Sequence, residues 1–147
     1  MFMGHHIHKI DARDRLSIPV RMREELYRGG REHPIITVGF EKCLFLYPME
    51  RWKKFSEEAE SLKTSREDSR KIERFLFANA SECPFDSQGR ILVAKHLLDY
   101  AQLNKDVVII GVRNRIELWD KSEWETQSML MRKTVLDVSE NVDGFSI

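Results

Sequence analysis

One short pattern occurs twice in this chain, and it limits the folds that the sequence can adopt. The first copy begins at Asp11 and reads DARDRLSIP, and the second begins at Asp86 and reads DSQGRILVA. Each copy has an aspartate, a turn, an arginine four places on and then an apolar run typical of a β-strand. A pattern repeated in this way indicates two equivalent units in one chain.

The repeat extends beyond these two stretches. Gly39 and Gly111 each follow a strand-like run, and Trp52 and Trp124 come later in each half. These later pairs are 72 positions apart, whereas the opening stretches are 75 apart, so the first half holds three more residues. We place them in the loop 28–34, because loops tolerate insertions. We expect the two glycines to supply positive φ at hairpins.

Within each half the residues predict two strands, a short helix and a hairpin. In the first half a strand is expected at 7–10, a turn at 11–14 and a helix at 20–27. Pro19 suits the start of that helix, because its missing N–H would be unpaired there in any case.

Each half is expected to end in a longer helix. In the first half Trp52, Phe55, Ala59 and Leu62 have the spacing of one apolar helix face, and packing is the favoured interpretation of both tryptophan helices. Asp120 and Glu123 have the spacing of a capping box, which predicts the start of the corresponding helix in the second half.

A further helix should link the two halves, because Thr64 and Glu67 also have capping-box spacing and an apolar face follows them. The stretch after Lys133 is polar and acidic, and we expect it to be frayed.

These elements predict an α+β fold in which two pseudo-symmetric β-α-β modules share one β-core, with flanking helices. The limits are 5–50 for the first module, 51–78 for the connecting helices, 79–122 for the second module and 123–147 for a C-terminal helix and acidic tail. One unit of ~50–60 residues has too little interior to be stable alone. The hairpins of the two units are therefore expected to interlock.

Composition excludes several classes of protein. The 147 residues are 41% hydrophobic and 33% charged, as in a globular protein, and no apolar run is long enough to cross a membrane. The N-terminus has no signal-peptide pattern, and two isolated cysteines suit a reducing compartment, so we expect a cytoplasmic protein. Net charge is zero, but residues 1–31 hold seven lysines and arginines against four acidic residues, an excess of three that permits a basic face.

The repeated turn has two interpretations. In the structural one, Asp11 and Asp86 accept hydrogen bonds from the backbone of their own turns, while Asp14 and Gly89 adopt the left-handed conformation. In the functional one, the turn directs an arginine towards phosphates or a guanine edge. Two matched arginines on one pseudo-symmetric face suit duplex DNA.

Other candidate sites are weaker. On a strand only His6 and His8 share a face with each other, His5 points the other way, and no ligand set completes a metal site nearby. No nucleophile elbow, P-loop or dinucleotide motif is present. We therefore expect no enzyme activity, no cofactor, no metal and no small-molecule substrate.

Taken together, these residues resemble the MraZ family. The resemblance runs in order through both repeats to about residue 125. It rests on Met1-Phe2-x-Gly4, His8, Asp11-x-x-x-Arg15-Leu16-Ser17-Ile18-Pro19, Cys43-Leu44-Phe45-Leu46-Tyr47-Pro48, Trp52, Ala80-Ser81-Glu82-Cys83, Asp86-x-x-Gly89-Arg90-Ile91-Leu92 and Glu117-Leu118-Trp119.

The resemblance implies a bacterial transcriptional regulator, usually a repressor, of the division and cell-wall gene cluster. Such a protein binds short direct repeats in double-stranded DNA upstream of its own gene, which would associate it with the nucleoid. The resemblance also implies two AbrB-like swapped-hairpin modules and a ring-shaped homo-oligomer.

For the site, the resemblance implies that Arg15 contacts DNA, with Arg13 beside it, and that Arg90 is its equivalent in the second module. Lys9 joins this set from the basic excess at the N-terminus. The family has glycine where this chain has Asp14, which adds a negative charge beside Arg15.

We expect the first copy to touch DNA and the second mainly to complete the fold and the ring. The alternative is a protein-interaction scaffold or antitoxin-like module with weak or no DNA binding.

Overall fold

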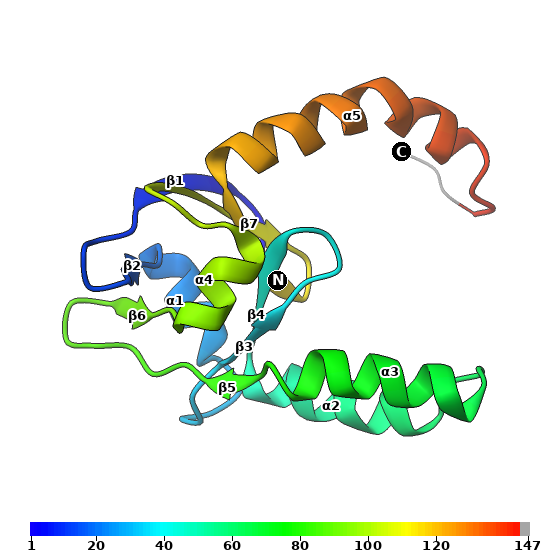
Figure 1. Cartoon of the computed structure of the whole chain (residues 1–147), viewed down its shortest axis with the longest axis horizontal. Coiled ribbons are helices and arrows are strands. Elements are labelled where there is room, and N and C mark those ends of the chain that lie inside the picture. Colours follow the sequence, from blue (N-terminus) through cyan, green and yellow to red (C-terminus); the bar gives the residue numbers. More distant parts are fainter. Residues whose placement is uncertain (145–147) are drawn as a thin grey trace.

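Figure 1 shows the computed structural model, which describes residues 1–144. The chain is a mixed α+β structure, as expected. Its elements are, in chain order, β1 (His5–Lys9), β2 (Arg15–Ser17), α1 (Val20–Leu26), β3 (Ile35–Val38), β4 (Cys43–Tyr47), α2 (Met49–Glu60), α3 (Arg66–Phe77), β5 (Ser81–Glu82), β6 (Arg90–Leu92), α4 (Lys95–Ala101), β7 (Asp106–Val112), β8 (Arg115–Asp120) and α5 (Lys121–Glu140).

The strand order of the main sheet reflects the repeat: the order is the same from either edge of the sheet when equivalent strands of the two halves are exchanged. Six antiparallel strands run β1-β7-β8-β4-β3-β5, and β2 pairs with β6 in a separate two-stranded sheet. The repeat makes β1 equivalent to β5, β3 to β7 and β4 to β8. The first strand of each half therefore pairs with the third strand of the other half. In β1 and β7 His5 lies opposite Ile110, and in β3 and β5 Ile36 lies opposite Ser81. The two halves are interlocked through the backbone.

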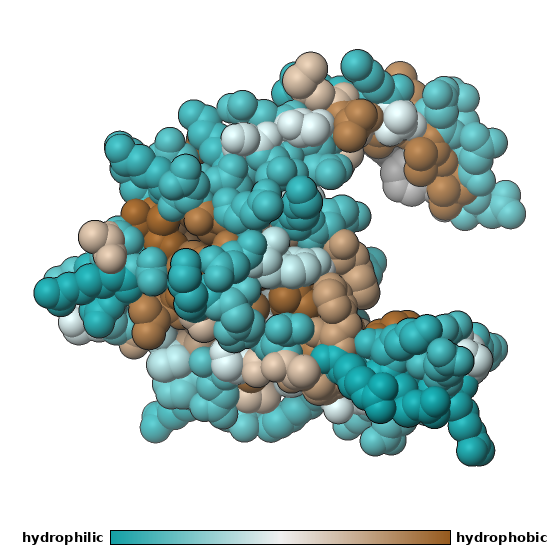
Figure 2. All heavy atoms as spheres, in the orientation of Figure 1, coloured by the Kyte–Doolittle hydropathy of each residue, from teal (hydrophilic) through white to brown (hydrophobic). Residues whose placement is uncertain are grey.

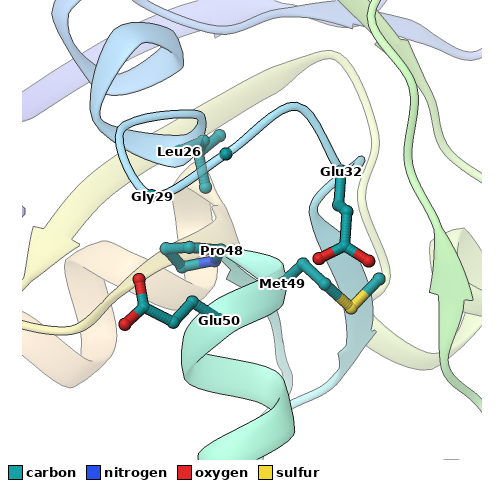
Figure 3. Close-up of a pocket in the computed structure, with 7 residues that line it drawn as sticks. Leu26, Gly29, Glu32, Pro48, Met49 and Glu50 are labelled. Atoms are coloured by element: carbon teal, nitrogen blue, oxygen red, sulfur yellow. The ribbon is translucent and has the colours of Figure 1, made fainter.

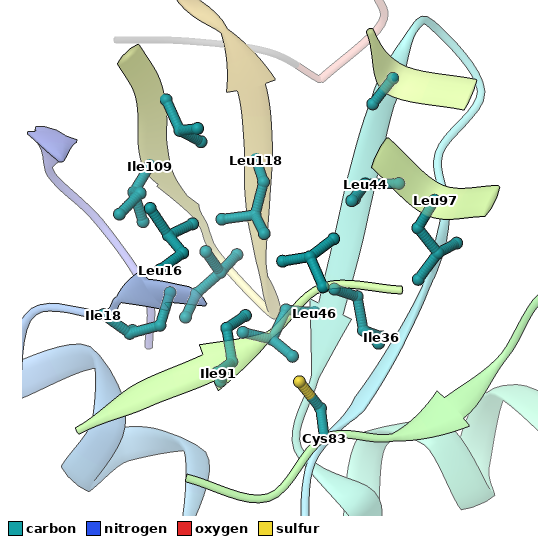
Figure 4. Close-up of a cluster of buried hydrophobic side chains, with 14 of the residues drawn as sticks. Leu16, Ile18, Ile36, Leu44, Leu46, Cys83, Ile91, Leu97, Ile109 and Leu118 are labelled. Atoms are coloured by element: carbon teal, nitrogen blue, oxygen red, sulfur yellow. The ribbon is translucent and has the colours of Figure 1, made fainter. Parts of the chain in front are cut away.

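One face of the sheet packs on the small sheet and on α1 and α4, and this layer holds the core. Figure 4 shows Leu16 and Ile91, from the two strands of the small sheet, meeting Leu46, Ile109 and Leu118 of the large one. All five side chains are fully buried. Each such side chain contributes about 1.5–3 kcal/mol by leaving water. Because both halves supply them, the core belongs to neither half alone.

The opposite face of the sheet carries a second, aromatic cluster. Phe45 and Trp119 are buried there with Cys43. The carboxylate of Glu117 is also buried, where it accepts hydrogen bonds from the guanidinium of Arg115 at 2.6 Å and the indole of Trp119 at 2.9 Å. A buried charge is tolerated when it is paired and hydrogen-bonded in this way.

Both cysteines are free and buried, as their sparse occurrence suggested. Burial raises the pKa of both thiols, that of Cys83 to about 12. The thiol form therefore predominates at neutral pH, and the side chains act as small apolar groups of the core.

The flanking helices differ in how they are packed. Helices α2 and α3 lie side by side, and Trp52 of α2 meets Phe77 of α3 with ring centroids 4.9 Å apart. Helix α5 instead leads away from the sheet and has no buried residue. Among the described residues no helix has the length and apolar character to cross a membrane.

Three helix predictions need correction. The N-cap of α3 is Ser65, whose hydroxyl accepts from the amide of Asp68 at 3.1 Å, and not Thr64. Leu62 lies beyond the end of α2 and is exposed. The stretch after Lys133 is not frayed, because α5 continues to Glu140. Residues 145–147 of the predicted acidic tail lie outside the described residues.

The glycine prediction was wrong in its reason. Neither Gly39 nor Gly111 has a positive φ; the left-handed residue in the β7–β8 turn is Arg113, at φ 59°. These glycines are required because other atoms come close. A Cβ at Gly39 would lie 2.8 Å from the Phe45 ring, and one at Gly111 would overlap the backbone of Met3.

Candidate nucleic-acid interface

The first repeated turn is built around one carboxylate. Oδ1 of Asp11 accepts hydrogen bonds from the backbone amides of Arg13 at 2.8 Å and Arg15 at 2.9 Å. The amide of Asp14 bonds to the carbonyl of Asp11 at 3.1 Å and closes the turn. The hydrogen bond from the Arg15 amide is the main reason that the pKa of Asp11 is lowered. The aspartate thus fixes the local backbone that precedes β2.

The second turn repeats the first almost bond for bond. Oδ1 of Asp86 accepts from the amides of Gln88 and Arg90, both at 2.9 Å, and the amide of Gly89 bonds to the Asp86 carbonyl at 3.1 Å. The backbone bond from Arg90 is again the main reason that the pKa of Asp86 is lowered. The structural interpretation of the pattern therefore describes both turns.

The pairing of β2 with β6 brings the two turns together. Leu16 lies opposite Ile91, and the turns lie side by side at one end of the molecule. Backbone bonds extend this pairing past the strands: the amide of Ile18 bonds to the Gly89 carbonyl at 3.2 Å and that of Val93 to the Asp14 carbonyl at 2.9 Å. Figure 2 shows hydrophilic residues at the tip of this end of the molecule, with apolar residues beside them.

The arginine of each turn reaches the aspartate of the other. Nη1 of Arg15 lies 3.5 Å from Oδ2 of Asp86, and Nη1 of Arg90 lies 3.4 Å from Oδ2 of Asp11. Arg90 also pairs with Asp86 of its own turn, Nε to Oδ2, at 2.8 Å. Partly exposed ion pairs of this kind add little stability each, but together they hold the two turns in a fixed relation. No feature of the repeat pattern indicated this crossing.

Arg13 and Lys9 are placed differently from the two crossed arginines. Both side chains are exposed, and neither forms an ion pair within residues 1–144. Arg15 and Arg90 are partly buried at the junction. The four basic residues that we expected to act together therefore divide into two that tie the turns to each other and two that face solvent.

Asp14 occupies the position where a left-handed residue is needed. Its φ is 61°, and that of Gly89 at the matching position is 75°. An aspartate adopts this conformation at some cost, which a glycine avoids. Its charge lies near Lys95, the first residue of α4, and raises the pKa of that ammonium after the larger effect of Asp99. The carboxylate of Asp14 is therefore partly balanced by a cation of the other half.

Figure 3 shows one depression of the surface, which lies beneath the loop after α1. It is lined by Leu26, Gly29, Pro48 and Met49, with Glu50 at its rim, and has a volume of about 30 Å³. Sites for small molecules measure about 300 Å³ or more, so this one holds no more than a water. Within residues 1–144 no three His, Cys, Asp or Glu side chains are grouped so that they could hold a metal ion.

The fold and the crossed turns define a class: single-chain proteins in which two repeated α+β modules interlock and present paired basic turns at one end. Comparison of the sequence with those of known proteins identifies the family. The family model described as "MraZ protein, putative antitoxin-like" matches residues 1–75 and 76–137, one match for each half. This chain belongs to the MraZ family.

Individual relatives agree with this assignment. The chain is 40% identical over its full 147 residues to "Transcriptional regulator MraZ" of Caldanaerobacter subterraneus subsp. tengcongensis, and 42% identical, again over 147 residues, to the protein of that name in Heliobacterium modesticaldum. Both matches cover all of either chain. It is also 47% identical over 125 residues to the Moorella thermoacetica protein, covering 85% of each.

Proposed function

We propose that this protein is a sequence-specific DNA-binding transcriptional regulator, acting as a repressor of the division and cell-wall gene cluster. It would bind short direct repeats upstream of its own gene, in the cytoplasm and in association with the nucleoid. Relatives that match its full length carry the name transcriptional regulator, which supports this role and a non-enzymatic function.

The observation that carries the proposal is the pair of joined turns. The aspartates fix the backbone, the crossed arginines hold the turns together, and Arg13 projects from the first turn without an ion-pair partner among the described residues. A guanidinium held at the tip of a rigid turn can fork onto phosphate oxygens or a guanine edge. Lys9, on the neighbouring strand, would add a second phosphate contact.

Assembly belongs to the same proposal. The exchange of first strands between the halves is compatible with AbrB-like swapped-hairpin modules at about 5–50 and 79–122, and the subunits would form a ring. A ring presents several such turns to successive DNA repeats, so that individually weak contacts add up through multivalency.

The test is a mobility-shift titration, at fixed salt, with a duplex taken from the region upstream of the gene. We expect Arg15→Ala to abolish binding, because it removes a cation and loosens the second turn. Arg13→Ala should weaken binding at least ten-fold while leaving Tm unchanged, because its exposed side chain forms no ion pair or hydrogen bond within residues 1–144. The matched control is Arg66→Ala at the start of α3, which removes one exposed charge elsewhere.

Unchanged binding by both turn variants, with the oligomer intact in gel filtration, would contradict the proposed interface.

The second candidate is a protein-interaction or antitoxin-like module. The description of the family as antitoxin-like favours it, and so does the negative charge of Asp14 beside the basic residues. This candidate predicts DNA binding without sequence preference or salt dependence. Comparison of the upstream duplex with a scrambled duplex at two salt concentrations separates the two candidates.

A further inference from the structure

Arg23 is a basic residue whose role the repeat does not explain. It lies on α1, and its guanidinium packs against Gly89 of the second turn. A Cβ at position 89 would lie 2.9 Å from Nε of Arg23 and would overlap both Cζ and Nη1. Gly89 therefore does more than provide a positive φ: it leaves room for the arginine of the other half to lie on the turn.

The charge of Arg23 has no partner within residues 1–144. Its Nε is buried and makes no hydrogen bond, and neither Nη atom has a hydrogen-bond partner among the described residues, where the side chain is half-buried. No carboxylate among the described residues lies within ion-pair distance. A guanidinium that packs on the backbone of a turn and has no hydrogen-bond partner among the described residues is pre-organised for an anionic oxygen.

The position is asymmetric between the two halves. The repeat makes Leu98 the equivalent of Arg23, and Leu98 is buried in the core. Likewise Gln88 is the equivalent of Arg13 in the second turn. Each turn thus has one free guanidinium: Arg13 of its own loop at the first turn, and Arg23, supplied by a helix, at the second.

We propose that Arg23 is the phosphate-contacting residue of the second turn, a role that the sequence had suggested for Arg90. Arg90 forms ion pairs with the carboxylates of Asp11 and Asp86, and these contacts hold the two turns together. Arg13 and Arg23 would then contact the backbone of one duplex from the two adjacent turns, with the Nη groups of Arg23 donating to phosphate oxygens. The inference rests on the proposed DNA-binding function and assigns the second turn a direct part in it.

The test measures binding of the full chain to a fluorescent duplex from the upstream region, across a series of salt concentrations. Arg23→Met keeps the apolar stem over Gly89 and removes the charge. We expect it to bind about ten-fold more weakly and to reduce the magnitude of the slope of log K against log salt by about 0.9 for each bound subunit, because each subunit loses one phosphate contact. Arg23→Lys, which keeps the charge, should restore most of the slope.

Two controls distinguish the outcomes. Arg66→Met removes a distant charge and should leave the slope unchanged, and thermal melting of each variant reports the fold. If wild type binds and Arg13→Ala weakens it while Arg23→Met keeps both the affinity and the slope, Arg23 makes no contact and this inference is wrong. A loss of affinity that Arg23→Lys does not restore, accompanied by a lower Tm, would assign Arg23 a structural role and also overturn it. If wild type itself fails to bind, the proposed function fails as well.

Discussion

At the scale of single residues, Asp11 and Asp86 contribute more to the conformation of the turns than the arginines that follow them. Each carboxylate accepts hydrogen bonds from two backbone amides and also forms an ion pair with the arginine of the opposite turn. The sequence could predict the first role, because an aspartate followed by a turn is a local pattern. It could not predict the second, because the crossing of Arg15 and Arg90 depends on the register of β2 with β6.

Acid should weaken the turns in a defined direction. The folded-state pKa of Asp86 is lowered, mainly by the backbone bond from Arg90, so its ionised form stabilises the fold above the unfolded-state pKa near 3.9. That stability is lost as the pH falls through the lower, folded-state pKa. We expect Asp86→Asn to lower Tm by a few degrees at pH 7 and the difference from wild type to shrink as the pH falls below about 3.9.

Melting curves of both proteins between pH 2.5 and pH 7 check this prediction. Asp137→Asn on the exposed part of α5 is the control. A difference in Tm that stayed constant over the whole pH range would show that the charge of Asp86 is not responsible.

Asp14 is the left-handed residue of the first turn, at the position that Gly89 occupies in the second. We expect Asp14→Gly to bind the upstream duplex about 3–10-fold more tightly, because it removes a negative charge next to Arg13, the proposed phosphate contact. Asp14→Asn removes the charge but keeps a side chain at φ 61°, so it should give most of the same gain. Weaker binding by both variants, measured by fluorescence anisotropy, would mean that the carboxylate itself contributes to recognition.

At the scale of secondary-structure elements, the helices were predicted better than their ends. The tryptophan periodicity located α2, and Asp120 caps α5, accepting from the amide of Ser122 at 3.1 Å. The extent of α5 was missed, because the apolar residues of its C-terminal half are exposed and its polar composition suggested fraying. Met131, Val135 and Val138 follow one another at helical spacing and are exposed, and Figure 2 shows apolar residues along this helix.

This stripe predicts how the proposed ring depends on α5. If a second copy of the chain covers it, Val135→Glu should leave Tm nearly unchanged, because the side chain is 55% exposed within one chain, and should reduce the assembled mass. Light scattering coupled to gel filtration measures that mass. Thr126→Glu, a change at an exposed polar position of the same helix, should preserve the assembly. The same mass for both variants would exclude this face from the interface.

At the scale of the whole molecule, the repeat carried the most information. It predicted two modules with one core, because a single unit buries too little apolar surface. The pairing of β1 with β7 and of β5 with β3 is the structural expression of that prediction. The sequence did not predict the asymmetry between the halves. Arg23 and Leu98 occupy equivalent positions, and only the packing of Arg23 over Gly89 shows why they differ.

Interlocking predicts that the two halves unfold together. Leu97 of α4 is fully buried in the shared core, so Leu97→Ala should lower the free energy of unfolding by about 2–5 kcal/mol. Denaturant unfolding should still show one transition by both fluorescence and circular dichroism. Leu92→Ala, at a position 63% exposed, should cost less than about 0.5 kcal/mol. Two separate transitions would mean that the halves fold independently.

A footprint of the region upstream of the gene shows whether the paired turns bring this protein to repeated DNA sequences. With wild-type protein we predict protected segments that coincide with each direct repeat and share its spacing. Arg13→Ala should lose them at the same protein concentration. If protection is absent, or is spread evenly without following the repeats, the paired turns do not recognise the repeated sequences.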